Sequence, residues 1–147
     1  AIAVGASCEV TTMPGYLPAL SEKADASVLT AAEIAAQTSE KDYQIVQEDT
    51  HAYSGGSTDV GDVQHLQPVL TFNTGGKVSG LHSVDFDIVD EELAYVVTAK
   101  IFALSAYRLL RDRAVKAKEI VANYQPIFTK EEYIKYMDSF IKTETYS

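Results

Sequence analysis

The sequence predicts an α/β fold, and three observations support this prediction. Short segments of alternating or β-branched residues are typical of strands, longer segments with apolar residues three and four apart are typical of helices, and the two kinds follow one another along the chain. With 147 residues, of which 46% are hydrophobic and 22% charged, the chain has the composition of one globular domain that can bury a core. The expected order is strand, helix, strand, loop, strand, loop, long helix, short helix.

The first strand is expected over residues 2–12, where small and apolar side chains alternate imperfectly with polar ones. Pro14 and Gly15 then form a turn, and a domain boundary is plausible over residues 16–25, where proline and polar residues concentrate. Cys8 is the only cysteine, so it cannot form an intramolecular disulfide, and we expect it to be a small buried residue.

A helix should follow this boundary, because Thr30 and Glu33 have the spacing of a capping box and apolar residues surround them. Strands are predicted at residues 43–48 and 67–72. Between them, residues 51–66 form a polar segment rich in glycine, aspartate and histidine, which we expect to be a loop.

A second glycine-rich loop is expected over residues 73–86, followed by one long helix over residues 90–123. The first half of this helix is apolar almost all round, which predicts burial between other elements. After Pro126, Thr129 and Glu132 have the spacing of a second capping box and predict a short amphipathic helix.

Composition excludes several classes of function. The net charge of -9, from 12 basic against 21 acidic residues, leaves no basic surface for nucleic acid or for anionic lipid. The most apolar stretch, residues 93–104, is shorter than the roughly 20 residues that cross a bilayer. The first residues lack the pattern of a signal peptide, and the single cysteine suits a reducing compartment. We therefore expect a cytoplasmic protein with no membrane contact.

The three histidines lie in or beside the two loops. His51 fits a solvated or loop-bonding residue, and His65 fits a structural residue that hydrogen-bonds a backbone carbonyl. His82 is flanked by glycines that allow close approach of a ligand, and a neutral imidazole is the commonest metal ligand, so structural and metal-binding interpretations are equally open for it.

The glutamate pairs favour structural roles, whereas Asp59 and Asp62 are open to a structural or a ligand-orienting role. The pairs Glu91-Glu92 and Glu131-Glu132 fall in first helical turns, where the helix dipole stabilises carboxylates. Asp59 and Asp62 lie in the sequence GGSTDVGD, which can cap a short helix or form an Asx turn. The same aspartates can also orient a ligating histidine by accepting its second ring N–H.

Taken together, these motifs resemble the C-terminal third of the aminoacylase and carboxypeptidase family of dinuclear zinc hydrolases. The resemblance rests on YSGGSTDVGDV over residues 53–63, Pro68, the sequence Gly-Leu-His ending at His82, and the long helix that follows. It is closest to the branch that includes aminobenzoyl-glutamate utilization protein B. The sequence VTTMPGYLP, residues 10–18, is similar to the last strand of that family's inserted lid domain.

The resemblance implies that residues 19–147 are the C-terminal part of a three-layer α/β/α catalytic domain. Residues 1–18 would end the lid or dimerisation domain and return the chain to the catalytic domain, so that the neighbours of the first strand lie outside this chain. Left alone, such a strand should pair with another copy or pack loosely. The resemblance assigns no role to residues 124–147.

The resemblance also implies the site. His82 matches the last metal-ligand histidine of the family. The loop beside the metals corresponds to Gly56, Ser57, Thr58 and Asp59. The region that receives the substrate's carboxylate end corresponds to Gly75 and Gly76. The complete enzyme would hold two zinc ions, or another divalent metal.

No His-x-Asp motif occurs in this chain, so the catalytic glutamate, the bridging aspartate and the remaining ligands would lie upstream of Ala1. No residue of this chain is therefore assigned as catalytic, and the chain alone is expected to be inactive. The implied substrate is a small N-acyl or aryl-acyl amino acid or a dipeptide-like amide, and the complete enzyme would be a homodimer. The alternative is a non-catalytic binding or interaction domain with a degenerate site.

Overall fold

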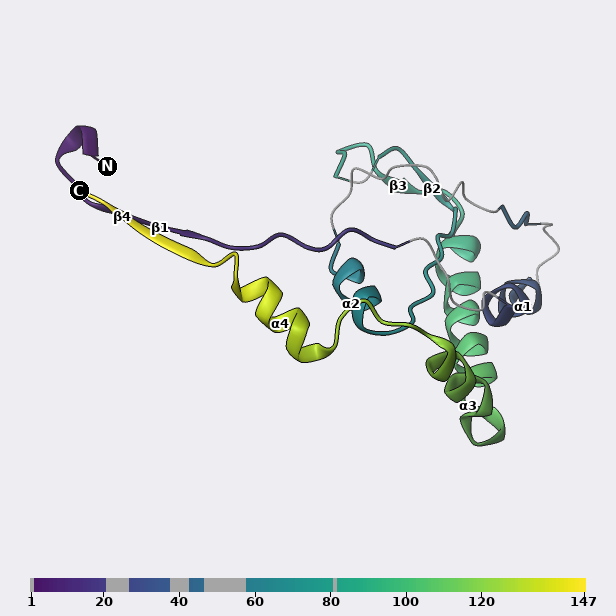
Figure 1. The fold of residues 1–147 in the computed structure, drawn as a ribbon. Helices are drawn as coiled ribbons and strands as arrows, with labels where there is room; N and C mark the ends of the chain where they lie inside the picture. Colours follow the sequence, from purple (N-terminus) through teal and green to yellow (C-terminus); the bar gives the residue numbers. More distant parts are fainter. Residues whose placement is uncertain (1, 21–26, 38–42, 47–57, 81) are drawn as a thin grey trace. The chain divides into compact units, whose positions relative to one another are not determined.

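A computed structural model describes residues 2–20, 27–37, 43–46, 58–80 and 82–147 (Figure 1). The chain divides into two compact units. The terminal unit comprises residues 1–20, 54–68 and 125–147, and the central unit comprises residues 21–53 and 69–124. The first 20 residues thus share a unit with two later segments, and the assignment of residues 1–18 to a lid domain stays a prediction.

In the terminal unit, the first strand forms only in part. Residues Ile2–Val4 form a 3-10 turn, η1, which corrects the expected strand start, and β1 spans Cys8–Thr12. β1 pairs antiparallel with β4, Lys142–Tyr146, a strand that the sequence did not predict. Because β4 is its only described neighbour, β1 buries little, and Cys8 is half-buried where full burial was expected.

The expected loop over residues 51–66 contains a helix, α2, at Val60–Leu66. Residues 17–20 lie along this helix: the Asp62 Oδ1 accepts the Leu17 N–H at 2.8 Å, and the Gln64 Oε1 accepts the Leu20 N–H at 2.8 Å. Gly61 permits this approach, because a Cβ there would lie 2.0 Å from the Leu17 carbonyl oxygen. The helix is therefore held by its packing against an extended segment, a contact between residues distant in sequence.

The short helix predicted after Pro126 is confirmed as α4, Lys130–Asp138. Both bonds of the predicted capping box are present: Glu132 N–H donates to the Thr129 Oγ1 at 3.2 Å, and Thr129 N–H donates to the Glu132 Oε2 at 2.8 Å. The Thr129 N–H and the Thr129 hydroxyl, which donates to the same Oε2 at 2.8 Å, stabilise the charged carboxylate, so the pKa of Glu132 is lowered from its usual 4.5.

In the central unit, the predicted helix after residue 25 is confirmed as α1, Ser27–Ala36, but it begins before the expected cap, so Thr30 lies inside it. α1 packs against the long helix, and the two form the core of the unit. The buried core residues are Leu29, Ala36, Val97 and Ile101.

Two strands predicted for this part of the chain do not form. Residues 43–46 have no strand structure, residues 47–48 lie outside the described residues, and residues 67–72 have no strand partner. Tyr43, Leu70 and Phe72 instead pack by their side chains against the core. An apolar run becomes a strand only where a neighbour completes its hydrogen bonds.

The second predicted loop contains two short strands, β2, Lys77–Val78, and β3, Asp87–Ile88, which pair antiparallel. The two sheets in the described residues are thus both antiparallel and two-stranded. A three-layer α/β/α domain remains an expectation from the resemblance.

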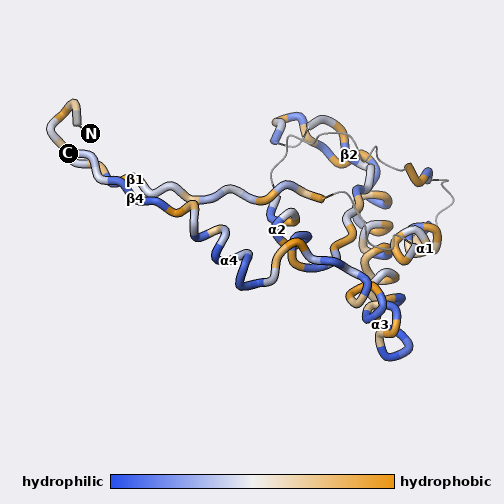
Figure 2. Tube along the Cα trace, in the orientation of Figure 1, coloured by the Kyte–Doolittle hydropathy of each residue, from blue (hydrophilic) through white to orange (hydrophobic). Residues whose placement is uncertain are grey.

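The predicted long helix is confirmed: a π-helical segment, η2, Glu92–Val97, leads into α3, Thr98–Asn123. A break interrupts α3 at residues 111–114, where three residues in succession have positive φ. The predicted burial of the first half is wrong, because the side chains of Tyr95 and Phe102 are 60% and 63% exposed. α1 covers one side of this helix, and apolar residues occur on its other sides as well (Figure 2).

By length and composition alone, the combined helix Glu92–Asn123 could cross a membrane, and it is the one such helix in the described part of the chain. Mostly buried core helices of soluble proteins meet the same criterion, whereas 11% of the apolar window of this helix is buried. The most apolar stretch, residues 93–104, is shorter than this helix because the helix continues into residues of mixed polarity.

Candidate functional site

His82 lies in the loop that joins β2 to β3. Ser83 N–H donates to the Gly80 carbonyl at 3.2 Å, which closes a turn around His82. The backbone of His82 has a φ of 66°, in the left-handed region that favours glycine or asparagine, and its side chain is exposed. The imidazole is therefore not held in place by burial.

Gly76 fixes the base of this loop to the start of the long helix. Its carbonyl accepts the N–H groups of Val89 at 2.8 Å and Asp90 at 3.1 Å. Its φ is 89°, and a Cβ there would lie 2.6 Å from the Asp90 carbonyl oxygen and 3.0 Å from the Ala94 nitrogen. Only glycine fits this position, so Gly76 has a structural role whether or not it also binds substrate.

The π-helical segment and the first residue of α3 hold the N-terminal end of the loop base. The Thr98 Oγ1 donates to the Leu93 carbonyl at 3.2 Å and lies 2.8 Å from the Thr74 Oγ1. Gly75 packs against the same segment, since a Cβ there would lie 3.1 Å from the Leu93 Cδ2. The loop therefore has an anchored base and an exposed tip that carries His82.

The other predicted site residues lie in the terminal unit or outside the described residues. Asp59 is the N-cap residue of α2, but its side chain makes no capping hydrogen bond. Thr58 donates to the Asp59 Oδ1 at 3.4 Å. Gly56 and Ser57 lie outside the described residues. Because Asp59 and His82 belong to different units, a hydrogen bond between them stays a prediction.

The structural interpretation of His65 is confirmed. Its Nδ1 lies 2.7 Å from the Gly61 carbonyl oxygen, which can only accept, so the Nδ1 carries the proton. The ring is 6% exposed and stacks on Phe128 with 6.0 Å between ring centroids. His51 lies outside the described residues. His82 is thus the one described histidine whose ring is exposed.

Asp62 is an anchoring residue. The sequence did not distinguish its role from that of Asp59. Its carboxylate accepts the Leu17 N–H and is hydrogen-bonded to the Tyr133 hydroxyl, so it ties α2 to two distant segments. Burial, followed by the negative charge of Asp62 and this hydrogen bond, raises the pKa of Tyr133 above 10.0. The only sequence signal was an aspartate in a first helical turn, which does not reveal a distant partner.

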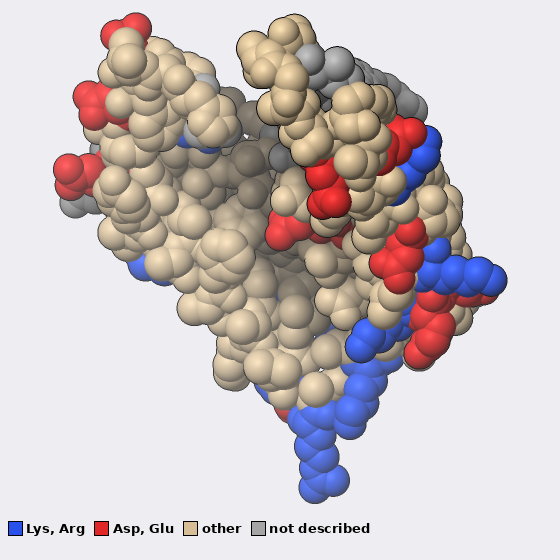
Figure 3. Space-filling model, turned by 90° about the vertical axis from the view of Figure 1, so that its left-hand side faces the viewer, with Lys and Arg blue, Asp and Glu red and all other residues tan. Residues whose placement is uncertain are grey.

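The central unit also contains an open pocket of about 330 Å³ beside the break in α3. Its walls carry both signs of charge, and two ion pairs lie there: Arg111 with Asp112 at 3.6 Å, and Lys116 with Glu119 at 3.5 Å. Lys and Arg side chains also project at one end of the view in Figure 3. Mixed charges that pair with one another define no ligand class.

Metal binding by this chain alone is not supported by the side chains that the structure places. Among the described residues, no three His, Cys, Asp or Glu side chains are grouped so that they could hold a metal ion. His82 can supply one ligand, and a zinc site needs three or four. Comparison with family models, with curated proteins and with solved structures finds no match to this chain.

Proposed function

We propose that this chain is the C-terminal part of the catalytic domain of a metal-dependent amidohydrolase, and that it contributes one metal ligand, His82. The observation that supports the proposal most strongly is the conformation of this residue. Its backbone is left-handed, which costs a non-glycine residue roughly 1–2 kcal/mol. Its ring is exposed and makes no hydrogen bond to the described residues. A histidine at such a position is best explained by a requirement for its imidazole.

The remaining ligands and the general base come, in this proposal, from parts of the complete enzyme that this chain does not contain. The chemistry that a bound zinc supplies is the polarisation of the amide carbonyl and the acidification of a water molecule. His82 ligates as the neutral imidazole, with its second ring N–H donated to a fixed acceptor such as Asp59 or a backbone carbonyl. Two zinc ions, a three-layer domain and a cytoplasmic homodimer belong to the same proposal.

The proposed substrate is an N-acyl or aryl-acyl amino acid, or a dipeptide-like amide with a free carboxylate. The anchored loop base at Gly75 and Gly76 suits the wall of such a pocket, because the absence of side chains leaves backbone groups open to a ligand. The sequence GSTDVGDV, which runs into α2, supports the family assignment.

The second candidate function is a non-catalytic interaction domain, and the long helix favours it. Tyr95, Phe102 and Tyr107 are each about 60% exposed or more, and exposed aromatic residues are enriched at protein interfaces. An interaction domain has no need for zinc binding at His82, so metal binding distinguishes the two candidates.

A zinc titration to high concentration, followed by the ring resonances of the three histidines, tests the proposal on this chain, in which a single ligand should bind zinc only weakly. We expect the His82 resonances to shift first, since His65 is buried and already hydrogen-bonded through its Nδ1. His82→Asn removes the imidazole and keeps a residue that tolerates the left-handed backbone, and it should abolish the first shift. Equal shifts of all three histidines, or none at His82, would favour the interaction domain.

A further inference from the structure

The open pocket of the central unit lies at the break in α3. Arg108 and Arg111 line it from the part of the helix before the break, Lys116 and Glu119 line it from the part after the break, and Val28 belongs to α1. In a straight helix, residues 108 and 119 would be roughly 16 Å apart along the axis. The break therefore brings both parts of α3 to one pocket of about 330 Å³.

The backbone of the break has an unfavourable conformation. Asp112, Arg113 and Ala114 have φ values of 53°, 60° and 60°, in the left-handed region that residues with side chains disfavour. Residues held in such conformations cluster at ligand sites and switch regions. The pocket beside the break is therefore a candidate binding site.

The charges of the pocket leave one cation without a partner. Arg111 pairs with Asp112 and Lys116 pairs with Glu119, so these four charges are matched. Arg108 is half-buried, and it makes no ion pair or hydrogen bond in the described part of the chain. The paired residues define no ligand class, but Arg108 leaves an unmatched positive charge in the wall of the pocket.

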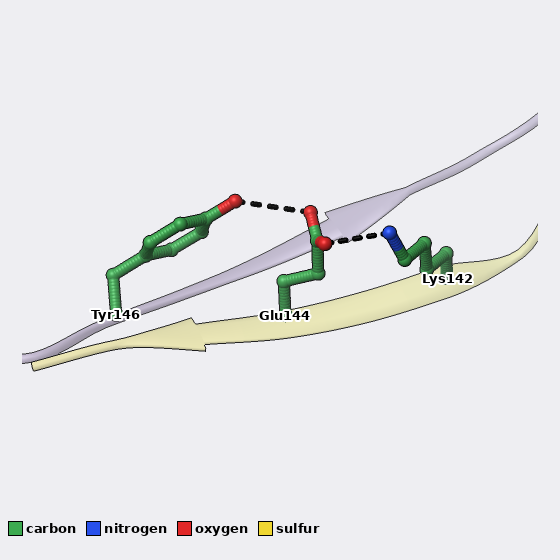
Figure 4. Close-up of polar contacts among 3 residues, drawn as sticks. All are labelled: Lys142, Glu144 and Tyr146. Atoms are coloured by element: carbon green, nitrogen blue, oxygen red, sulfur yellow. Dashed lines mark hydrogen bonds and ion pairs between the residues drawn. The ribbon is translucent and has the colours of Figure 1, made fainter.

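Arg108 differs in this respect from a cation such as Lys142 on β4. The Lys142 Nζ donates to the Glu144 Oε1 at 2.6 Å, and the Tyr146 hydroxyl donates to the Oε2 of the same carboxylate at 3.0 Å (Figure 4). Lys142 is also exposed, whereas Arg108 is half-buried and therefore less completely solvated by water. Because partial burial of an unpaired charge is unfavourable, Arg108 favours an anion in the pocket.

We propose that this pocket binds a small molecule with a single carboxylate and a short apolar group. The Arg108 guanidinium matches a carboxylate, because its planar fork can donate two parallel hydrogen bonds. Val28 and Val115 line the same pocket and suit the apolar group. Asp112 and Glu119, also in its wall, disfavour the higher charge of a phosphate. The site shares no residue with the proposed metal site, so the two proposals are independent.

An NMR titration of the chain with 3-methylbutanoate tests the class of ligand. We expect saturable shifts of the backbone amides of residues 27–28 and 108–119, at a Kd of roughly millimolar order for a ligand of this size. The uncharged 3-methylbutanamide has nearly the same shape and should bind about tenfold more weakly, because it lacks the charge-assisted hydrogen bonds. Inorganic phosphate has charge without an apolar group and should also bind more weakly than the carboxylate.

Substitution of Arg108 tests whether this residue holds the ligand. Arg108→Gln should weaken binding by about tenfold or more, whereas Arg108→Lys keeps the charge without the fork and should retain part of the affinity. Arg113→Gln is the matched control: it removes the same charge from an exposed residue outside the pocket wall, and it should leave binding unchanged. Thermal unfolding without ligand should be alike in all three variants, which separates loss of binding from loss of folding.

Four results would overturn the proposal. The absence of saturable shifts with 3-methylbutanoate would overturn the site itself. Equal binding of the uncharged amide would overturn the role of the positive charge, and equal or tighter binding of phosphate would overturn the ligand class. Equal weakening by Arg108→Gln and Arg113→Gln would overturn the assignment of Arg108, because it would indicate a general attraction to the cations of this part of α3.

Discussion

Two residues of the β2–β3 hairpin, Gly76 directly before β2 and His82 in the loop between the strands, are subject to opposite constraints. Gly76 occupies a position with no room for a side chain, since a Cβ would lie 2.6 Å from the Asp90 carbonyl oxygen. His82 carries a large side chain on a backbone that favours glycine or asparagine. The first constraint is set by packing, whereas no described contact accounts for the second. This contrast is why we assign the chemistry of the loop to His82.

Gly76→Ala should destabilise the chain by about 2 kcal/mol or more, because it combines a disfavoured φ with a clash against backbone atoms that cannot move aside. Gly80→Ala is the matched control in the same loop, since a Cβ there meets nothing within 4 Å. Urea unfolding measures both. Equal, small effects would show that the loop is not anchored at Gly76.

Sequence reasoning at the residue scale succeeded where the controlling contacts are local. The backbone bond of His65 reaches Gly61, four residues earlier, and the capping bond of Thr129 reaches Glu132, three residues later. It did not identify the role of Asp62, whose partners Leu17 and Tyr133 are distant in sequence. Nor could it identify the left-handed backbone of His82, because most histidines, although enriched in that region, do not adopt it.

At the scale of elements, helices followed from the sequence better than strands did. α4 begins at the predicted capping box, and the long helix has its predicted extent, although a break at residues 111–114 interrupts it. The strands predicted at residues 43–48 and 67–72 have no partner in the described residues, while β4 pairs with β1 from the far end of the chain. A strand depends on a neighbour that its own sequence does not specify.

The capping box of α4 should make this helix sensitive to acid. The pKa of Glu132 is lowered in the folded state by the bonds from Thr129, so the stabilisation is present above the usual pKa of 4.5 and is lost as the pH falls through the folded value. Amide exchange within α4 should therefore rise in acid. Glu132→Gln should remove most of this pH dependence, and an unchanged profile in that variant would contradict the assignment.

The break in α3 predicts opposite effects for two similar substitutions. Ala114 has a φ of 60°, so Ala114→Gly should relieve strain and stabilise the chain by up to about 1 kcal/mol. Ala117 lies three residues later, after the break in α3, where Ala117→Gly should cost about 1 kcal/mol. Thermal unfolding of the two variants compares them directly. Similar destabilisation by both would indicate an unbroken helix.

At the scale of the molecule, the described residues hold parts of the proposed site in place but do not form a complete site. The central unit presents His82 on an anchored loop, and the terminal unit holds α2, with Thr58 and Asp59 at its start. The sequence indicated both loops but could not supply the geometry between them. In our proposal, the remaining ligands and the general base of the complete enzyme lie in parts that this chain does not contain.

The 147-residue chain should therefore show no amidase activity, even with added zinc. A catalytic unit that lacks its general base and most of its ligands typically loses several orders of magnitude in rate. Hydrolysis of an N-acyl amino acid by the purified chain can be compared with hydrolysis by His82→Asn. Turnover above that of the variant would mean that the chain contains a catalytic site of its own.

The most direct test of the central claim is the zinc content and turnover of the complete enzyme carrying His82→Asn. We expect zinc to be lost and turnover to fall by orders of magnitude, with little change in stability, because an exposed side chain fills no core volume. Asp59→Asn should be milder, on the order of 10-fold to 100-fold, as is usual for residues that orient a ligand. Near-normal turnover and full zinc content in His82→Asn would contradict the assignment of His82 as a ligand.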